Sequence, residues 1–243
     1  IAVLGYLSLY TMGKTLQEIK SELDISQTTA YRILNTLVRL GYLIYNEDTK
    51  HYKLSRKLLT LGFRSLNEHN LLEIVLPHLR NLRDQVKETA CFGVLGDQKG
   101  IFIEQAQGHH TFRFVLSPGK PFELHCSAPG KAIMAYLPNT VRDYYLAQME
   151  FTRYNARTIT TPEAYMEELE KVRRQGYAMD NEEELSGVVC VGTPIFNYTS
   201  YPCGAIWISG PKDRLSKEVI RQSVEYIKDT AQCISRELGY SHI

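Results

Sequence analysis

Ser26-Gln-Thr-Thr-Ala-Tyr-Arg-Ile-Leu-Asn-Thr-Leu-Val-Arg-Leu-Gly41 is the stretch of sequence that decides how the first part of the chain folds. Ser26 is a good N-cap because its side chain can accept an N–H of the first helical turn. Gly41 suits the position that ends a helix. Apolar residues recur at helical spacing along one side: Ala30, Ile33, Leu34, Leu37 and Val38. The stretch therefore predicts an amphipathic helix over residues 27–40.

The opposite side of this predicted helix is polar, with a stripe formed by Thr28, Tyr31, Arg32, Asn35 and Arg39. An α-helix fits the major groove of B-DNA, where each base pair presents a distinct pattern of donors and acceptors. Gln27 could pair with adenine, and Arg32 with guanine or a phosphate. The open backbone N–H groups at the helix start suit a phosphate as well. This side is therefore a candidate for reading DNA.

The elements predicted around this helix complete a known layout. Two helices precede it and a hairpin follows it: residues 1–11 ended by Gly13, 16–23 capped by Thr15, and strands 43–46 and 51–54 around a turn at 47–50. Three helices and a hairpin form a winged helix-turn-helix, predicted for residues 1–57. Lys50 and Lys53 on the wing, with Arg56 and Lys57 beyond it, could neutralise phosphates. The predicted DNA-binding residues are Ser26, Gln27, Thr28, Thr29, Tyr31, Arg32, Asn35, Lys50 and Lys53.

The remaining sequence predicts a linker helix over residues 58–70 and a larger domain over 71–243. A long helix is expected to begin at Asn70, with a kink or a late start at Pro77. Strands are predicted at 90–95, 101–107, 112–116, 188–196 and 203–209, and helices at 130–137, 141–149, 162–175 and 217–238. Hairpins mixed with helices, and few βαβ units, indicate an α+β domain with a mainly antiparallel sheet flanked by helices.

Length and composition suit two modest globular domains in a chain of 243 residues, 44% of them hydrophobic and 23% charged. The apolar runs are too short to span a bilayer. No signal peptide is expected, and because the sequence lacks an initiator Met, residues are expected to precede Ile1. Five dispersed cysteines indicate reduced thiols rather than a disulfide framework: Cys91, Cys126, Cys190, Cys203 and Cys233.

Charge is distributed unevenly along the chain. Residues 1–65 contain nine lysines and arginines against five aspartates and glutamates, whereas residues 66–243 contain nineteen against twenty-two. A basic small domain joined to a mildly acidic large one indicates that only the first meets a polyanion.

The motifs along the chain resemble those of the IclR family of bacterial transcriptional regulators over nearly the whole length. In the small domain they are the Ser26 stretch, Leu40-Gly-Tyr-Leu, Tyr52-Lys-Leu and Leu59-Thr-Leu-Gly. In the large domain they are His125-Cys-Ser-Ala-Pro-Gly-Lys-Ala, Arg157-Thr-Ile-Thr, Gly176-Tyr-Ala-Met-Asp-Asn-Glu-Glu, Gly187-Val-Val-Cys and Ile208-Ser-Gly-Pro. The carboxyl end, Ile234-Ser-Arg-Glu-Leu-Gly-Tyr, resembles members that control sugar-acid catabolism.

The resemblance implies a regulator, here expected to be a repressor, that works in the bacterial cytoplasm on the nucleoid. Its larger domain is expected to be a GAF-like or profilin-like effector-binding and oligomerisation domain. The implied partners are a near-palindromic double-stranded operator, a small carboxylic acid derived from an organic or sugar source, and further copies of the chain in a dimer or a dimer of dimers. No membrane, cofactor or metal is implied. The implied effector-binding residues are Ala128, Pro129, Gly130, Asp180, Cys190, Trp207 and Ser209.

Two of these residues depart from what acid-binding members carry. Pro129 lacks an N–H, so one expected donor to an anion is absent. Trp207 stands where acid-binding relatives have a second serine, and its bulk either shrinks the pocket or stacks on a larger ligand. Asp180 could accept hydrogen bonds from ligand hydroxyls, and His125 could add a cation or a hydrogen bond nearby.

Other functions are also compatible with parts of the sequence. Cys126 beside His125 resembles a thiol enzyme, although adjacent residues on a strand point to opposite faces. His109 and His110 could bind a metal, but no further ligands stand at metal-site spacing, so exposed histidines are the better interpretation. A regulator that has lost ligand binding, and acts only as a scaffold on DNA, is a third alternative.

Overall fold

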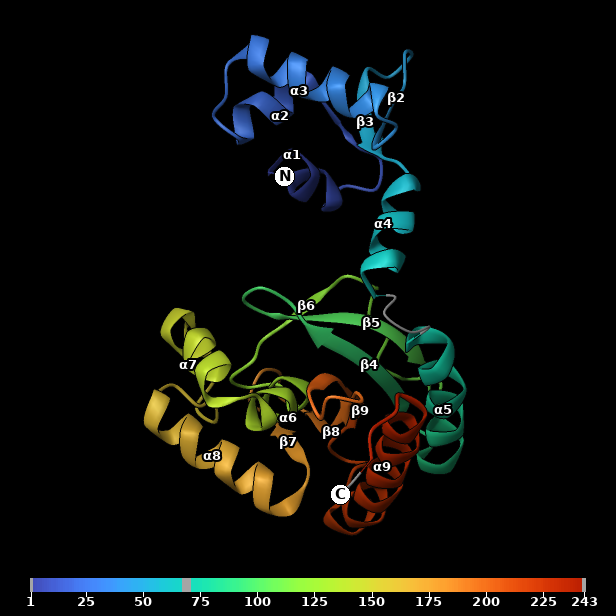
Figure 1. The fold of residues 1–243 in the computed structure, drawn as a ribbon, viewed down its shortest axis with the longest axis vertical. Coiled ribbons are helices and arrows are strands. Elements are labelled where there is room, and N and C mark those ends of the chain that lie inside the picture. The colour runs from blue at the N-terminus through green and yellow to red at the C-terminus, as the bar shows by residue number, and fades with distance from the viewer. Residues whose placement is uncertain (1, 67–70, 242–243) are drawn as a thin grey trace. The chain divides into compact units, whose positions relative to one another are not determined.

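The computed structural model describes residues 2–66 and 71–241, which fall into two compact units on either side of the gap. The fold class predicted from the sequence is confirmed: a helix-turn-helix unit precedes an α+β unit with an antiparallel sheet (Figure 1). Among the described helices, none is both long and apolar enough to cross a membrane.

The smaller unit contains the predicted helices and hairpin, with one extra short strand. In chain order its elements are α1 Ala2–Ser8, β1 Lys14–Thr15, α2 Leu16–Glu22, α3 Gln27–Arg39, β2 Leu43–Tyr45, β3 His51–Leu54 and α4 Lys57–Leu66. The three strands form an antiparallel sheet in the order β1-β3-β2. β1, with only two residues, is too short to leave a periodic pattern in the sequence.

Side-chain caps fix where α2 and α3 begin. The Thr15 side chain accepts the backbone N–H of Glu18, and the Glu18 carboxylate accepts the N–H of Thr15 at 2.8 Å. This reciprocal capping box supplies partners for two N–H groups that the helix leaves open. Ser26 caps α3 in the predicted way, and Gly41 adopts a φ of 77° just beyond the helix, which glycine tolerates best.

The core of the smaller unit joins α1, α2, α3 and the hairpin through six buried residues: Val3, Leu7, Ile19, Leu34, Leu43 and Tyr52. Ala30 and Leu34 of the predicted α3 core stripe are buried, and Leu37 and Val38 are partly buried. Ile33, however, keeps 36% of its surface exposed, so its assignment to the core was wrong. The reason is angular: Ile33 follows Arg32 on the helix and lies at the edge of the stripe, toward the solvent.

The larger unit is built on one sheet of six strands in the order β6-β5-β4-β9-β8-β7, with every neighbouring pair antiparallel. Its helices are α5 Leu71–Val86, α6 Ala128–Tyr136, α7 Asn139–Gln148, α8 Pro162–Gln175 and α9 Lys217–Glu237. Its strands are β4 Thr89–Leu95, β5 Gly100–Ala106, β6 Pro121–Phe122, β7 Ala178–Asn181, β8 Val188–Phe196 and β9 Pro202–Pro211.

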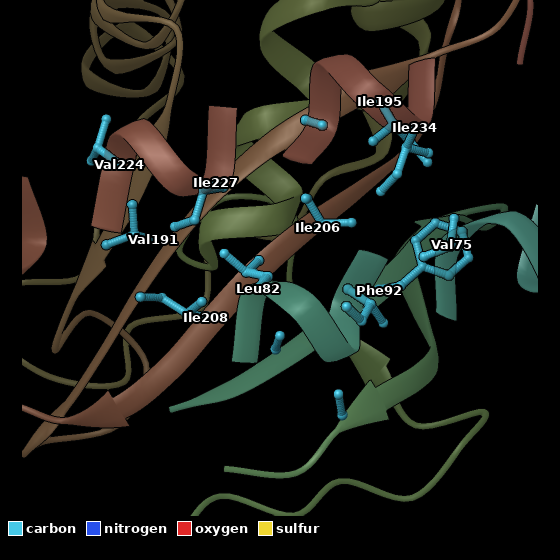
Figure 2. Close-up of a cluster of buried hydrophobic side chains, with 14 of the residues drawn as sticks. Val75, Leu82, Phe92, Val191, Ile195, Ile206, Ile208, Val224, Ile227 and Ile234 are labelled. Carbon is cyan, nitrogen blue, oxygen red and sulfur yellow. The ribbon is translucent and has the colours of Figure 1, made fainter. Parts of the chain in front are cut away.

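Strand alternation gives the sheet two different faces. On one face Phe92, Val191, Ile206 and Ile208 pack with α5 and α9 into the main core, as Figure 2 shows. Neighbouring positions, such as Ala205 and Trp207, point to the opposite face, because successive strand residues alternate. α6 packs on this second face, and α8 packs against α6 (Figure 1). The cavity described below lies on the same face of the sheet.

Two predictions for this unit were wrong, and two short strands were missed. Residues 112–116 are not a strand, because side chains rather than a neighbouring strand bind their backbone, and the edge strand is β6 instead. The four-residue strand β7 was not predicted. α5 runs without a break from Leu71 through Pro77, so the late start was wrong. The predicted cap Asn70 lies outside the described residues.

Candidate DNA interface and ligand cavity

The polar face of α3 is exposed to solvent in the smaller unit. Gln27, Thr28, Tyr31, Arg32 and Asn35 all have exposed side chains. None of these side chains makes a hydrogen bond or an ion pair with another described residue. Polar groups that project from a rigid helix without internal partners remain available to an external one.

Two predicted DNA-binding residues have a structural role at the start of this helix. The Ser26 Oγ accepts the backbone N–H of Thr29 at 3.2 Å and shares a hydrogen bond with the Thr29 Oγ1 at 2.9 Å. The two side chains therefore hold each other and the first turn. Both remain exposed, but one hydrogen-bonding position of each is already occupied.

The wing carries two exposed lysines. Lys50 closes the β2–β3 turn at a positive φ of 58°, and Lys53 projects from β3. The Asn46 Oδ1 accepts the N–H groups of Asp48 and Thr49 at 3.0 and 2.8 Å, which fixes the turn. The wing therefore holds both lysines on an ordered hairpin.

Lys57, which follows the wing, has partners inside the unit. Its Nζ donates to the Leu40 carbonyl at 2.8 Å and lies 5.0 Å from the centre of the Tyr42 ring. A cation at the carboxyl end of a helix is stabilising, because the last carbonyl groups lack intrahelical partners. Lys57 therefore caps α3, and we assign its role to the fold.

The larger unit contains a cavity of about 140 Å³ on the second face of its sheet. Among the predicted effector-binding residues, Pro129, Asp180, Cys190, Trp207 and Ser209 line it, whereas Ala128 and Gly130 are buried in α6 and do not. The lining also includes residues that the sequence analysis did not identify: Phe102, Phe114, Leu116, Lys120, Pro121, Phe122, Ser127, Glu184, Leu185 and Val188. Aromatic residues near Trp207 gave no motif, because they come together only when β6, β5, β4 and β9 assemble in that order in the sheet.

Strand register brings the polar lining residues together. Cys190 of β8 pairs with Asp180 of β7 on one side and with Ser209 of β9 on the other. The Cys190 Sγ and the Ser209 Oγ lie 3.2 Å apart and share a hydrogen bond. Three polar side chains from three strands thus lie in one row at the base of the cavity.

Aromatic rings form the wall next to this row. The Trp207 ring meets Phe102 edge to face at 6.0 Å and Phe122 at 5.6 Å between ring centres. Such arrangements suit the quadrupoles of the rings and fix their positions. Trp207 is the single tryptophan of the chain and is 3% exposed, so its fluorescence reports on this wall alone.

Residues 107–120 connect β5 to β6, and side chains bind this segment at several points. The Gln105 amide binds both the N–H and the carbonyl of Leu116, at 3.1 and 2.8 Å, and Thr89 donates to the Phe114 carbonyl at 2.9 Å. Arg214 holds the Phe112 carbonyl and a bidentate ion pair with the buried Glu88. These bonds replace strand pairing and position Phe114 and Leu116 at the cavity.

The amino end of α6 offers few donors to a ligand. Ser127 caps the helix by accepting the Gly130 N–H at 3.1 Å, and Pro129 has no N–H. The Lys131 N–H already binds the Ser127 carbonyl within the helix. Of the backbone N–H groups expected to bind an anion here, only that of Ala128 has no hydrogen-bond partner among the described residues.

Asp180 is the most perturbed acid that lines the cavity. Its carboxyl is 5% exposed, and burial raises its pKa to about 7, against the lowering effect of the Glu183 N–H that it accepts at 2.7 Å. The charge on Glu183 raises the pKa further. The other carboxyl oxygen has no hydrogen-bond donor among the described residues.

This burial predicts a pH dependence of stability that Asp180→Asn removes. The raised pKa means that the folded state keeps a proton that the unfolded chain loses near its ordinary pKa of 3.8. The contribution of Asp180 to stability is therefore greatest below that value, falls as the pH rises to about 7, and then levels off, with a loss of up to about 4 kcal/mol. Urea unfolding of the full chain, followed by Trp207 fluorescence, measures it. Parallel pH profiles for the wild type and the variant would contradict the assignment.

A buried ion pair lies beside the cavity without lining it. Lys131, 0% exposed, donates from its Nζ to the Glu183 Oε1 at 2.6 Å, and its Nζ lies 3.6 Å from the Glu168 Oε1. The Thr158 hydroxyl and the Asn155 amide bind the Glu183 carbonyl at 2.7 and 3.1 Å. The chain after β7, which carries Glu184 and Leu185 to the cavity, is therefore anchored to α6 and to the loop before α8.

The alternative site around Cys126 does not have the geometry of an activated thiol. Burial raises the pKa of Cys126 and lowers that of His125, whose Nε2 shares a hydrogen bond with the Thr152 carbonyl at 3.0 Å. A thiol enzyme needs the opposite, a thiolate stabilised by a nearby base. Neither residue lines the cavity.

The side chains of the two neighbouring histidines lie near carboxylates. The His109 Nε2 lies 2.8 Å from Asp84, and the His110 Nε2 lies 3.7 Å from the buried Glu88. Within the described ranges, no three histidine, cysteine or acidic side chains gather closely enough to hold a metal ion. His109 therefore connects the segment before Phe114 to α5, and His110 lies near the residue that precedes β4.

Comparison with known proteins gives matches for both units. The model of the bacterial transcriptional regulator IclR C-terminal domain matches residues 63–236, and that of the IclR helix-turn-helix domain matches residues 1–47. The HTH-type transcriptional regulator BhcR of Paracoccus denitrificans is 32% identical over 92% of this chain and 80% of its own length. The DNA-binding transcriptional repressor YiaJ of Escherichia coli is 31% identical over 99% of this chain and 86% of its own length.

A solved structure extends the match to three dimensions. The Thermotoga maritima IclR crystal structure has a TM-score of 0.75 and 31% sequence identity, and the match covers 98% of this chain and 96% of that one. The family resemblance read from the sequence motifs is thereby confirmed.

Proposed function

The chain belongs to the IclR family of bacterial transcriptional regulators, and on that premise we propose that it is a repressor with a small-molecule effector. In this proposal α3 and the wing bind an operator in the bacterial nucleoid, and an organic acid in the cavity changes the affinity for it. The E. coli relative YiaJ, which matches nearly the whole chain, is a repressor by name and supports the direction of control.

The observation that carries the DNA-binding part is the exposed face of α3. Five polar side chains project from it without partners among the described residues, and capping by Ser26 and Lys57 holds both ends of the helix. Arg32 can form a bidentate pair with guanine, and Gln27 with adenine, the geometries that the major groove favours. Tyr31, 55% exposed, offers a ring and a hydroxyl beside them.

The operator is expected to contain two half-sites. One α3 covers only a few base pairs, so a sequence long enough to be specific needs two copies of the helix, one from each protomer of a dimer. Dimers of this kind read half-sites about 34 Å apart, one helical turn, or a multiple of that distance. We therefore propose a near-palindromic operator and a homodimer or a dimer of dimers.

The cavity supports an effector over the scaffold and enzyme alternatives. It combines apolar walls with a few converging polar groups, the composition of a small-molecule site. An effector shifts operator affinity only as far as it binds one state of the protein more tightly than the other. The absence of an activated nucleophile among the described residues lining the cavity favours binding without turnover.

The wing lysines provide a test of DNA binding. Each phosphate that the protein neutralises contributes roughly 0.9 to the slope of log affinity against log salt concentration. In a dimer Lys53→Ala removes two such contacts, so the slope is expected to fall by about 2. Fluorescence anisotropy on a duplex selected from random DNA with the full chain measures this slope.

Arg221→Ala, which removes a similar charge from the exposed face of α9, is the matched control and is expected to leave the slope unchanged. Equal changes for Lys53→Ala and Arg221→Ala, or no change for either variant, would contradict the role of the wing.

A further inference from the structure

We propose that the effector is a single-ring aromatic compound with a hydroxyl group, and that it binds with the hydroxyl inward on Asp180 and any carboxylate outward at Lys120. This inference rests on the proposed function, in which the cavity is the effector site. It reverses the orientation that the sequence motif implies, where a carboxylate meets the amino end of α6.

The size and walls of the cavity favour one flat ring. Its volume is about 140 Å³, and an apolar protein cavity of about 150 Å³ holds one benzene molecule. Phe102, Phe122 and Trp207 form one continuous aromatic wall, and Phe114 and Leu116 face the same space from the anchored 107–120 segment. Rings pack against such walls by edge-to-face or offset contacts, which add to the burial of their surface.

The buried polar groups accept hydrogen bonds more readily than they donate them. Asp180 presents one carboxyl oxygen without a donor, and Ser209 and Cys190 already share a hydrogen bond with each other. Ser127 is occupied by its own helix cap and by the Glu123 carbonyl. A ligand hydroxyl that donates to Asp180 would supply the missing partner, and buried polar groups are costly when left without one.

A carboxylate in the same inner position would be unfavourable. It would meet the Asp180 carboxyl and find neither the Gly130 N–H nor an N–H at Pro129. Lys131 is close in sequence, but Glu183 and Glu168 hold it and it does not line the cavity. Above about pH 7, where Asp180 is ionised, like charges in this low-dielectric site repel strongly, so the inner end of the ligand is then expected to be uncharged.

The mouth of the cavity has the cation that the interior lacks. Lys120 is the only basic residue that lines the cavity within the described chain, its side chain is exposed, and it has no ion pair there. Glu184 also lines the cavity, and its carboxylate and the Lys120 ammonium attract each other. A carboxylate opposite the ligand hydroxyl would therefore lie near Lys120, in water, at little desolvation cost.

An open-chain sugar acid fits this cavity poorly. It carries several hydroxyl groups, and each loses its water partners on entering. Away from Lys120 and Glu184, the polar lining side chains are Asp180, Ser127, Cys190, Ser209 and the indole N–H of Trp207. Ser127, Cys190 and Ser209 already have hydrogen-bond partners, and the rest of the interior is aromatic or aliphatic. Each hydroxyl buried without a partner costs about 1–3 kcal/mol.

The experiment titrates the full chain with four probes above pH 7, where Asp180 is ionised, and follows Trp207 fluorescence. We expect 4-hydroxybenzoate to bind at least about tenfold more tightly than benzoate, since a site built to bind a hydroxyl rejects the analogue that lacks it. Gluconate is expected to bind more weakly than either, and 4-methylphenol tests the ring without the carboxylate. If benzoate binds as tightly as 4-hydroxybenzoate, the ligand hydroxyl does not bind Asp180. If gluconate binds more tightly than the aromatic probes, the effector is not an aromatic ring.

Two variants test the contacts at the two ends of the ligand separately. Asp180→Asn keeps the shape but presents an amide, so the preference for 4-hydroxybenzoate over benzoate is expected to fall below about threefold. Lys120→Ala is expected to weaken 4-hydroxybenzoate and leave 4-methylphenol unchanged. An unchanged preference in Asp180→Asn, or equal weakening of both phenols in Lys120→Ala, would overturn the orientation. If none of the four probes binds, the effector is not a hydroxylated aromatic ring. DNA binding, the other part of the proposed function, is tested separately by the salt dependence of Lys53→Ala.

Discussion

Lys131→Met is expected to destabilise the larger unit by about 3–5 kcal/mol, a large effect for a single substitution. The Lys131 side chain is 0% exposed, and its Nζ is the cation that Glu183 meets in the interior. The Glu183 Oε2 already lacks a hydrogen-bond partner. Removing the lysine therefore leaves a buried carboxylate without a counter-ion. Urea unfolding followed by Trp207 fluorescence measures the loss in the full chain.

Two further variants show whether the cost comes from the unpaired charge. Lys131→Met combined with Glu183→Gln removes both charges and is expected to recover at least half of the lost stability, because a neutral amide is cheaper to bury than a carboxylate. Lys171→Met breaks the exposed pair with Glu168 and should cost less than about 1 kcal/mol. If Lys131→Met also costs less than about 1 kcal/mol, the buried pair does not hold this part of the fold.

Arg32→Ala is expected to have the largest effect on operator binding. A bidentate contact of arginine with guanine contributes about 1–3 kcal/mol, and a dimer loses it twice. The expected loss is therefore about 2–6 kcal/mol, or roughly thirtyfold to more than ten-thousandfold in affinity. Arg32 is exposed and makes no side-chain bond with another described residue, so the fold of the smaller unit should be unaffected. Anisotropy on a selected duplex measures the affinity.

Arg32→Lys separates base reading from contact with a phosphate. Lysine keeps the charge but lacks the planar fork that binds two acceptors of one base. If Arg32 reads guanine, Arg32→Lys keeps the salt slope and loses discrimination between the selected duplex and one altered at that base pair. If the affinity and the discrimination of both variants equal those of the wild type, Arg32 does not take part in DNA binding.

Local signals made the smaller unit largely predictable. Thr15, Ser26 and Gly41 mark helix ends through hydrogen bonds and backbone angles that depend only on near neighbours, and the structure confirms each of them. The period of the apolar residues between them then identifies the core. Gly176 likewise ends α8 in the left-handed region, directly after the helix that the sequence predicted over residues 162–175.

Features that depend on distant parts of the chain were harder to predict. Residues 112–116 alternate like a strand, but their backbone partners are the side chains of Thr89, Gln105 and Arg214, which no local pattern reveals. The burial of Lys131 depends on Glu183, fifty-two positions away. Sequence motifs identified Asp180, Cys190, Trp207 and Ser209, whereas Phe102 and Phe122, which complete the aromatic wall with Trp207, reach it only through the assembly of the sheet.

The central claim, that this chain is a sequence-specific DNA-binding regulator, is tested most directly by selection of random duplex DNA with the purified full chain. The wild-type chain is expected to enrich a near-palindrome whose half-sites are separated by about 34 Å or a multiple of it. Arg32→Ala is expected to abolish this enrichment. A pool that remains random after selection, or the same sequence enriched equally by the wild type and by Arg32→Ala, would contradict the account.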